Sequence, residues 1–419
     1  MIASPPAFLR GLFAGAVAAA DPMLAVPQNL PPRPAGRVII VGAGKASARM
    51  AEAVESVWGP CDGLVITRYG HARPCAGIEI VQPAHPVPDS AGAQASQRML
   101  DLLAGAEEGD FVLSLISGGA SALLVAPVAE VTLAEKRAVN TALLASGAPI
   151  DRMNTVRKHL SRVKGGQLAA AAHPARMLSL MISDVPGDDP AFIGSGPTVG
   201  DASTPAEALA VLDHWSVAVP PAVRAALVAG SGVVPPGDRR LSRVENRVIA
   251  APAQSLAAAA AMARAEGVEV RILGDRVEGE ARDVARDHAA LALRLAAEHP
   301  AGGPPLLLLS GGELTVTKRG DGIGGPNAEY ALALALALQG TSGVHAIACD
   351  TDGIDGAAEV AGAIIGPDTL PRATAVGLDA AASLARNDAH SFFAALGDQV
   401  VTGPTLTNVN DFRAILIGA

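Results

Sequence analysis

The chain has 419 residues, which is more than one ordinary hydrophobic core supports, so we expect two α/β domains of roughly 150–250 residues each. Half of the residues are apolar and the net charge is −9, a balance that excludes a disordered chain and argues against a nucleic-acid-binding surface. The three cysteines, Cys61, Cys75 and Cys349, lack metal-binding spacing. They indicate reduced thiols in a cytoplasmic protein.

The first apolar segment has the spacing of an amphipathic helix, with Phe8, Leu9, Leu12 and Phe13. Residues 10–20 resemble a signal peptide only faintly, because the charge cluster of such a peptide is missing. Asp21 and Pro22 end the apolar run before it reaches membrane-spanning length, so we predict no membrane segment.

Residues 37–41 predict a strand, residues 42–45 a turn, the run up to Trp58 a helix, and residues 64–67 a second strand. The turn reads Gly42-Ala43-Gly44-Lys45, and backbone N–H groups at such a helix N-terminus hold phosphates or carboxylates. We expect Lys45 to contact a phosphate or the substrate. The alternative is a lysine that only solvates the turn.

The Gly42 turn matches neither of two well-known phosphate-binding motifs. Ile39 and Ala46 stand where a P-loop needs glycine and a hydroxyl residue. Ser47 stands where a dinucleotide-binding fingerprint needs its third glycine or an alanine.

A further buried strand, residues 111–116, ends at Ser117-Gly118-Gly119-Ala120-Ser121. Hydroxyls and unhindered amides after a strand suit a carboxylate or phosphate, while the alternative is a tight turn that needs glycine for space alone. Thr132 and Glu135 then form a capping box that opens a helix to about Ser146.

A basic segment follows, with Asn154 to His159 and Lys164-Gly165-Gly166 in an otherwise acidic chain. Arg157 and Lys164 are seven residues apart and so fall on one face of a helix. We predict that this segment lies at a cleft between the two expected domains, near the Gly42 turn. The alternative is a solvated helix face.

Another apolar run, residues 177–182, ends at Ser183-Asp184, and residues 186–190 must be a loop. Asp184 is a candidate metal ligand, base or helix cap. Ser195 and Gly196 lie in a loop, residues 194–198, that adds hydroxyls at the edge where α/β proteins bind ligands. Residues 233–237 are the best linker candidate, which predicts domains 1–236 and 237–419.

In the second half, residues 247–250, 268–273, 306–309 and 344–348 predict strands that alternate with helices, so we expect a largely parallel sheet. Ser310-Gly311-Gly312 repeats the strand-end pattern of Ser117-Gly118-Gly119. We predict that the two turns face one another, with Ser117 and Ser310 within about 20 Å. The acidic run 350–356 fails the spacing of a calcium-binding EF-hand but leaves a Mg²⁺ site open.

Taken together and in this order, these segments resemble the glycerate 2-kinase family over nearly the whole chain. The matching segments are Val41–Ala46, His85–Asp89, Ser117–Ser121, Asn154–His159, Lys164–Gly166, Ser183–Val185, Gly194–Thr198, Ser310–Glu313, Asp350–Gly353 and Thr405–Asp411. The resemblance implies ATP-dependent phosphoryl transfer to the 2-hydroxyl of D-glycerate. It also implies a Rossmann-like N-terminal domain and a second, leucine-rich α/β domain, with the active site in the cleft between them.

The resemblance places the family's essential lysine on Lys45. A further essential arginine of the family falls on Pro326, which cannot supply a cation. Either another basic residue replaces it, with Arg157, Lys158 and Arg319 as the candidates, or the activity is altered. The predicted catalytic residues are Lys45, Asp184 and Arg157, and the predicted metal ligands are Asp184, Glu313 and Asp352. The predicted substrate- and nucleotide-binding residues are Gly42, Gly44, Ser117, Gly118, Gly119, Ser121, Asn154, Lys164, Ser195, Gly196, Ser310, Gly311, Gly312, Asn327 and Asn408.

The expected cofactors are ATP and Mg²⁺, and the expected partners are D-glycerate and ATP, with no nucleic acid and no membrane; a homodimer is left open. Some family members carry the name hydroxypyruvate reductase. An NAD(P)H-dependent hydroxypyruvate reductase is therefore one alternative, and a non-catalytic anion-binding module is another. The incomplete fingerprint at Ser47 and the basic Arg68 after the second strand favour transfer over reduction.

Overall fold

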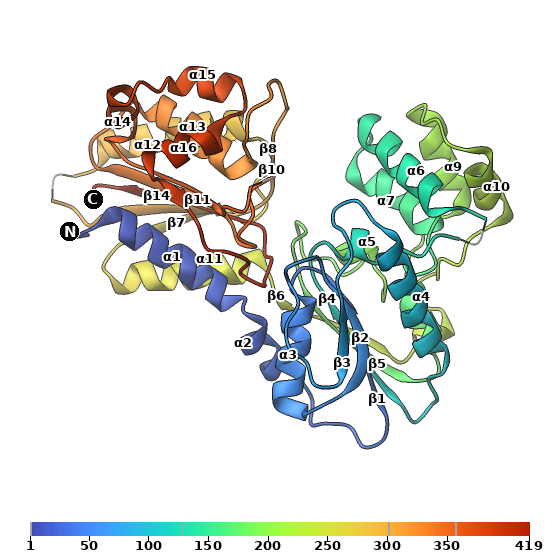
Figure 1. Cartoon of the computed structure of the whole chain (residues 1–419). Coiled ribbons are helices and arrows are strands. Elements are labelled where there is room, and N and C mark those ends of the chain that lie inside the picture. Colours follow the sequence, from blue (N-terminus) through green and yellow to red (C-terminus); the bar gives the residue numbers. More distant parts are fainter. Residues whose placement is uncertain (1, 129, 301, 357) are drawn as a thin grey trace. The chain divides into compact units, whose positions relative to one another are not determined.

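The computed structural model describes residues 2–128, 130–300, 302–356 and 358–419. It divides into two compact units, whose elements are labelled in Figure 1. We call Pro22–Ser183 with Asp188–Ile249 the N-terminal unit. The C-terminal unit consists of the chain up to Asp21, Asp184–Gly187 and Ala250–Ala419. The predicted two-domain α/β organisation is confirmed.

The N-terminal unit contains a six-stranded sheet in the order β3-β2-β1-β4-β5-β6. Its strands are β1 (Val38–Ala43), β2 (Asp62–Ile66), β3 (Ile78–Val81), β4 (Phe111–Ile116), β5 (Arg176–Ile182) and β6 (Val244–Ala250). The pairs β1–β2, β1–β4, β2–β3 and β4–β5 are parallel. This is the order of a doubly wound sheet, in which ligands bind beyond the carboxyl ends of the strands next to the switch point, here β1 and β4.

The helices of this unit are α2 (Pro22–Asn29), α3 (Ser47–Trp58), α4 (Ser90–Ala104), α5 (Ala120–Leu123), α6 (Leu133–Ala145), α7 (Ile150–His159), α8 (Gln167–Ala171), α9 (Pro205–His214) and α10 (Pro221–Ala229). The predicted capping box is confirmed, because Thr132 and Glu135 exchange side-chain and backbone hydrogen bonds at the start of α6. Helices α6, α7, α9 and α10 share a core that includes Leu143, Val156 and Leu212. This core holds α6 and α7, which carry much of the site described below.

The C-terminal unit has a six-stranded sheet in the order β13-β12-β11-β14-β9-β7. Its strands are β7 (Glu269–Gly274), β9 (Leu306–Ser310), β11 (Val344–Asp350), β12 (Gly362–Ile365), β13 (Gln399–Val400) and β14 (Asp411–Ile417), and β8 (Gly279–Glu280) pairs with β10 (Leu314–Thr315) separately. The prediction of a largely parallel sheet is wrong, because only β7–β9 is parallel among the described pairs of the large sheet. The last strand, β14, inserts antiparallel between β9 and β11, and an apolar run does not reveal strand direction.

Helices cover both faces of this sheet (Figure 1). They are α1 (Pro5–Ala19), α11 (Pro252–Ala265), α12 (Ala281–Glu298), α13 (Pro326–Leu338), α14 (Thr369–Ala375), α15 (Ala380–Ala385) and α16 (Ala389–Leu396). Figure 1 shows α1 and α11 on one face and α12, α13 and α16 on the other. The predicted amphipathic first helix is therefore α1, whose buried side chains pack on this sheet.

The division into units differs from the predicted boundary between residues 236 and 237. Strand β6 continues the N-terminal sheet, so the chain changes unit only after Ile249. Val234 is buried and its N–H donates to the carbonyl oxygen of Gly165, and residues 188–249 all belong to the N-terminal unit, so residues 233–237 do not link the two units. The first helix packs on α11, which places the start of the chain in the C-terminal unit.

By length and hydropathy alone, the stretch Pro5–Asn29 is sufficient to cross a membrane. The sequence prediction ended this run at Asp21, and the structure has two helices there, α1 and α2. The core helix of a globular protein passes the same test. Leu9, Leu12 and Phe13 are buried, and the Phe13 ring lies 5.8 Å from that of Phe412, the packing expected of such a core helix.

Candidate active site

The Gly42 turn and the Ser117 turn are joined by backbone hydrogen bonds. Strand β1 ends at Ala43, and the N–H of Lys45 donates to the carbonyl oxygen of Gly118 at 2.8 Å. Gly44 has a φ of +143°, and a Cβ atom there would lie 2.0 Å from the hydroxyl oxygen of Ser117. Only glycine fits this close approach, which sets Lys45 directly beside the second turn.

The hydroxyl of Ser117 faces the interior. It accepts the N–H of Ala46 at 3.0 Å and lies 3.0 Å from the hydroxyl of Ser47, and both serine side chains are fully buried. The Ser47 hydroxyl in turn donates to the carbonyl oxygen of Leu115. The predicted anion contact through the Ser117 hydroxyl is therefore not supported, because that hydroxyl braces the two turns instead.

Gly119 lies at the junction of the two turns. Its φ is +81°, and it caps the short helix α5. A Cβ atom at this position would lie 3.3 Å from Cγ of Lys45 and 3.0 Å from Nε2 of His85. The side chain of Lys45 and the ring of His85 thus flank Gly119, which itself lines a pocket.

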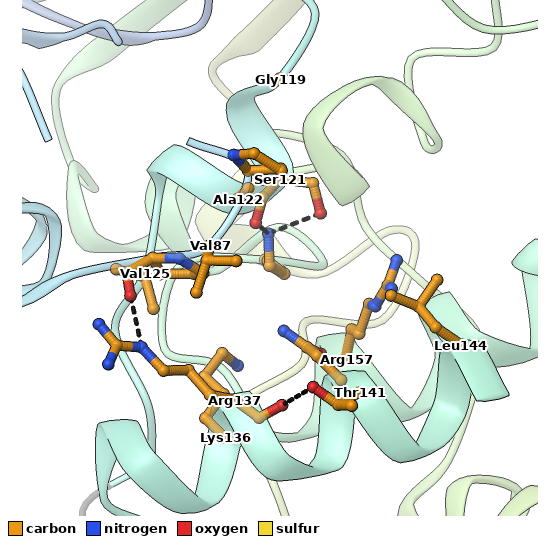
Figure 2. Close-up of a pocket in the computed structure, with 14 residues that line it drawn as sticks. Val87, Gly119, Ser121, Ala122, Val125, Lys136, Arg137, Thr141, Leu144 and Arg157 are labelled. Atoms are coloured by element: carbon orange, nitrogen blue, oxygen red, sulfur yellow. Dashed lines mark hydrogen bonds between the residues drawn. The ribbon is translucent and has the colours of Figure 1, made fainter. Parts of the chain in front are cut away.

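This pocket has a volume of about 320 Å³ and belongs wholly to the N-terminal unit. Its lining residues are Pro86, Val87, Pro88, Gly119, Ser121, Ala122, Val125, Lys136, Arg137, Asn140, Thr141, Leu144, Arg157 and Lys164. Figure 2 shows Gly119 and Ser121 on one side and Lys136 and Arg157 on the opposite side. Four basic side chains, Lys136, Arg137, Arg157 and Lys164, line the pocket and no carboxylate does, which makes it a candidate anion site.

The predicted basic segment contributes two of these cations. Arg157, near the end of α7, and Lys164 line this pocket together with Gly119, which adjoins Lys45 of the Gly42 turn. The predicted common helix face is wrong, because α7 ends at His159 and Lys164 lies beyond it. The predicted position at a cleft between the domains stays a prediction. Sequence inspection missed the other two, Lys136 and Arg137 on α6. Their only signal was the capping box that fixed the start of their helix.

Burial strongly affects the charges of the pocket. Burial, and then the positive charges of Lys136, Arg157 and Lys158, lower the pKa of Lys164 well below its ordinary value. Burial and then Arg157 lower the pKa of Lys136 to about 7. Among the described residues, Lys136, Arg157 and Lys164 form no salt bridge. Buried cations without a counter-charge are costly, and a bound anion would offset that cost.

Internal hydrogen bonds hold the buried cations in place. Lys164 donates through Nζ to the carbonyl oxygen of Ser121 at 2.7 Å and to its hydroxyl at 3.2 Å. Lys136 donates to the carbonyl oxygen of Leu160 at 2.8 Å. Arg157 donates to Oδ1 of Asn154 at 3.4 Å, so the predicted residue Asn154 orients the arginine.

The predicted loop residues Ser195 and Gly196 hold Ser121 and the glycine pair after Lys164 in place through hydrogen bonds. The hydroxyl of Ser195 lies 2.8 Å from that of Ser121. Gly165 donates its N–H to the carbonyl oxygen of Ser195, and Gly166 donates to that of Gly196. The glycine pair after Lys164 therefore ties this loop to the pocket.

The structure separates the three candidates for the missing family arginine. Lys158 forms a salt bridge with Asp201, so its positive charge already has a partner. Arg319 is exposed in the C-terminal unit. Arg157 alone of the three lines the cationic pocket.

In the C-terminal unit, the second Ser-Gly-Gly turn surrounds a buried arginine that sequence inspection missed. Arg413 on β14 is 1% exposed and donates to Asp411 at 2.8 Å, to the carbonyl oxygen of Gly311 and to the hydroxyl of Ser310. Burial raises the pKa of Asp411 although Arg413 lies beside it. The Ser310 hydroxyl and the Gly311 carbonyl thus serve this internal network.

Asn327 belongs to the same buried network. Its Nδ2 donates to Asp411 at 2.6 Å, and its backbone N–H donates to Asp355 at 2.9 Å. Asp355 also accepts the N–H of Ala328, so it caps the first turn of α13. Pro326 occupies the first position of α13, where a helix tolerates a residue without N–H. The predicted contact of the Asn327 side chain with substrate is therefore not supported by its burial.

The predicted metal ligands lie in the C-terminal unit. Nδ2 of Asn408 donates to Asp184 at 3.2 Å, so these two predicted residues are together. Asp352 accepts the N–H of Ile354 within its own turn, and Glu313 is exposed. Within residues 2–128, 130–300, 302–356 and 358–419, no three His, Cys, Asp or Glu side chains gather closely enough to hold a metal ion.

The predicted closeness of Ser117 and Ser310 stays a prediction, since the two residues belong to different units. Their turns differ locally. Gly119 precedes a helix, whereas Gly312, with a φ of +102°, precedes the short strand β10. The repeat in the sequence is therefore not a repeat in backbone structure.

The N-terminal unit thus combines a doubly wound sheet, a lysine in the first glycine turn and an adjacent pocket lined by basic side chains. Two family models match the chain, a domain of unknown function (DUF4147) over residues 8–228 and the MOFRL family over residues 306–411. Together with the relatives below, they show that the chain belongs to the glycerate kinase family.

Three relatives illustrate the family. A protein of Agrobacterium vitis with the provisional name hydroxypyruvate reductase is 52% identical over 98% of this chain and 94% of its own. The D-glycerate 2-kinase of Thermotoga maritima is 38% identical over 96% of this chain and 95% of its own. The glycerate 2-kinase of Pyrococcus horikoshii is 35% identical over 91% of this chain and 88% of its own.

Solved structures agree with this membership. The crystal structure of glycerate kinase from Thermotoga maritima has a TM-score of 0.88 and 37% identity, and the match covers 98% of this chain and 99% of that one. A protein of Pyrococcus horikoshii gives a TM-score of 0.81 at 33% identity, over 100% of this chain and 99% of that one. The predicted fold class is confirmed.

Proposed function

We propose that the protein is a glycerate 2-kinase, which transfers the γ-phosphoryl group of ATP to the 2-hydroxyl of D-glycerate and releases ADP and 2-phosphoglycerate. The observation that carries this proposal is the pocket lined by four basic side chains and no carboxylate, next to Lys45. D-glycerate is a small carboxylate whose charge matches that pocket. The names of the relatives from Thermotoga maritima and Pyrococcus horikoshii support the same reaction.

In this proposal, different residues of the N-terminal unit bind the substrate and stabilise the transferring phosphoryl group. The carboxylate of D-glycerate pairs with Lys136, Arg137 and Arg157 in the pocket. Lys45 stabilises the charge on the transferring phosphoryl group, because phosphoryl transfer depends on positioning and on cations near the equatorial oxygens. Gly119, between Lys45 and the pocket, leaves space where acceptor and phosphoryl group meet.

Binding of ATP with Mg²⁺ does not require a metal site built from protein ligands alone. Mg²⁺ usually keeps several waters and binds through one or two carboxylates plus substrate phosphates, so the absence of a three-ligand cluster among the described residues suits it. We infer that Asp184, oriented by Asn408, is the carboxylate that would hold it. When bound, the ion supplies positive charge to the nucleotide phosphates.

We also infer a cytoplasmic location, supported by the free cysteines Cys61, Cys75 and Cys349. Extracellular proteins tend to pair such thiols. A homodimer remains a prediction, which size-exclusion chromatography with light scattering would test.

Three measurements, of ADP release, NADPH oxidation and D-glycerate binding, separate the three candidate functions. The proposal expects ADP release with D-glycerate and Mg-ATP and no NADPH oxidation with hydroxypyruvate. NADPH oxidation without ADP release would establish the reductase instead. Binding of D-glycerate without either turnover would establish an anion-binding module.

We predict that D-glycerate affinity falls as pH rises through about 7, the lowered pKa of Lys136. The protonated amine binds the carboxylate, while free Lys136 loses its proton above that pKa, so the affinity at pH 8 is expected to be about tenfold lower than at pH 6. The D-glycerate carboxyl stays ionised throughout this range. The same shift makes the unliganded protein more stable from pH 7 upward, because only the unfolded chain still binds the proton.

Calorimetric titration with D-glycerate at the two pH values measures this effect. Lys136→Met removes the charge at similar volume and should bind weakly with little pH dependence. Equal affinities of the unmodified protein at pH 6 and pH 8 would show that Lys136 does not contact the carboxylate.

A further inference from the structure

We propose that Lys164 is the general base that accepts the proton of the substrate hydroxyl during phosphoryl transfer. The inference rests on the proposed function and gives Lys164 a chemical role beyond binding. Three observations carry it, namely the position of Nζ, the groups around it and the lack of a carboxylate in the pocket lining.

The position of Nζ leaves one site for a proton. A neutral amine has two N–H donors and one lone pair. Within the part of the chain that the structure describes, Nζ of Lys164 has two acceptors in hydrogen-bonding reach, the carbonyl oxygen of Ser121 at 2.7 Å and its hydroxyl at 3.2 Å. With both N–H groups directed to Ser121, the lone pair is free to accept a proton from a hydroxyl group in the pocket that Lys164 lines.

Ser121 is held firmly enough to orient the amine. Its hydroxyl lies 2.8 Å from that of Ser195, whose own backbone accepts the N–H of Gly165. Lys164 is only 1% exposed, so few rotamers remain to it. The base is therefore preorganised before substrate binds.

The charges around Lys164 favour its neutral form. The positive charges of Lys136 on α6 and of Arg157 and Lys158 on α7 act on it. Arg137 on α6 lines the same pocket, while Asp201 is paired with Lys158. Burial and these cations hold the pKa of Lys164 well below its ordinary range. The negative charges of the substrate carboxylate and the nucleotide phosphates raise this pKa again on binding, so Lys164 accepts a proton more readily once the hydroxyl group is in place.

The pocket lining offers no carboxylate for this task. His85 is the competing group, since its Nε2 flanks Gly119. His85 is not among the residues that line the pocket, whereas Lys164 is. Variants of the two residues therefore provide a matched comparison.

The proposed step balances. The proton of the 2-hydroxyl moves to Nζ of Lys164 as the hydroxyl oxygen bonds to the γ-phosphorus of ATP. The bond between that phosphorus and the bridging oxygen breaks, and its electron pair leaves with ADP. The Lys164 ammonium then releases its proton to solvent.

Kinetics of Lys164→Met at saturating Mg-ATP and D-glycerate test the proposal. We expect kcat to fall by roughly 10²–10⁴-fold, with KM for ATP changed by less than about threefold. The wild-type kcat should also decline on the acidic side of its pH profile, and His85→Gln should keep that decline. Thermal denaturation and ADP titration check that each variant is folded.

Lys164→Cys alkylated with 2-bromoethylamine separates a base from a structural lysine. The new side chain carries a less basic amine, so kcat should recover and the acidic decline should move to lower pH. Alkylated wild type is the control for Cys61, Cys75 and Cys349. Recovery without a shift of the decline would show that Lys164 only positions Ser121, which overturns the proposal.

Nitrogen NMR gives a readout that does not depend on turnover. The chain has only five lysines, so the Nζ signal of Lys164 can be assigned by its loss in Lys164→Met. We expect Lys164 in the free protein to lose its proton at a much lower pH than an ordinary lysine, because burial and the neighbouring cations lower its pKa. A Lys164 that keeps its proton over the whole pH range of an ordinary lysine, or kcat of Lys164→Met within about threefold of wild type, would overturn the inference alone. Wild type without ADP release would overturn the proposed function and this inference together.

Discussion

Replacing Lys45 with alanine is expected to lower kcat by roughly 10²–10³-fold, with a smaller effect on KM for D-glycerate. Charge develops on the phosphoryl group only as it leaves ADP, so a preorganised cation there acts mainly on the transition state. The turn itself should survive the change. Lys45 holds it through backbone atoms, with its N–H on Gly118 and its carbonyl oxygen on Nδ1 of His71.

Steady-state ADP release at saturating Mg-ATP measures this effect. Lys45→Arg serves as a second variant and should not restore full activity, because a planar guanidinium does not occupy the site of a compact ammonium. A lysine that only solvates the turn would leave kcat within about threefold of wild type, with slightly lower stability. That result would remove Lys45 from catalysis.

The sequence was informative where local patterns determine local structure. The strand Phe111–Ile116 was predicted with its observed bounds, because a fully buried strand forms an unbroken apolar run. The capping box at Thr132 located the start of α6. Strand direction and unit boundaries depend on distant pairings. The sequence of β6 therefore did not show that this strand joins the N-terminal sheet. In the same way, the sequence of β14 did not show that it lies antiparallel between β9 and β11.

The candidate site divides in the same way. Glycine turns at strand ends identified Lys45, Gly119 and Ser121, because close backbone approach has a sequence signature. Lys136 and Arg413 had none. Lys136 lies on a helix whose sequence does not show which face is buried, and Arg413 is the one cation inside an otherwise largely apolar strand, so only tertiary packing reveals its partners.

Removing the carboxylate of Asp411 is expected to have the largest effect on stability. Among the described residues, Asp411→Ala would leave Arg413, at 1% exposure, with only the Gly311 carbonyl and the Ser310 hydroxyl as acceptors. Breaking a buried ion pair by removing one partner costs about 3–5 kcal/mol, because the remaining charge stays desolvated. Asn327 would also lose its acceptor at 2.6 Å, which loosens the start of α13.

Urea denaturation followed by circular dichroism measures the loss, and the double variant Asp411→Leu with Arg413→Met is the matched control. Replacing both charges by apolar groups of similar size is often neutral or stabilising, so the double variant should be more stable than Asp411→Ala. If the two variants were equally destabilised, the loss would come from the hydrogen bonds of Asp411 to Asn327 and Leu314 and not from the stranded charge. If Asp411→Ala were as stable as wild type, water would have to reach Arg413. The buried position of Arg413 would then not constrain the Ser310 turn.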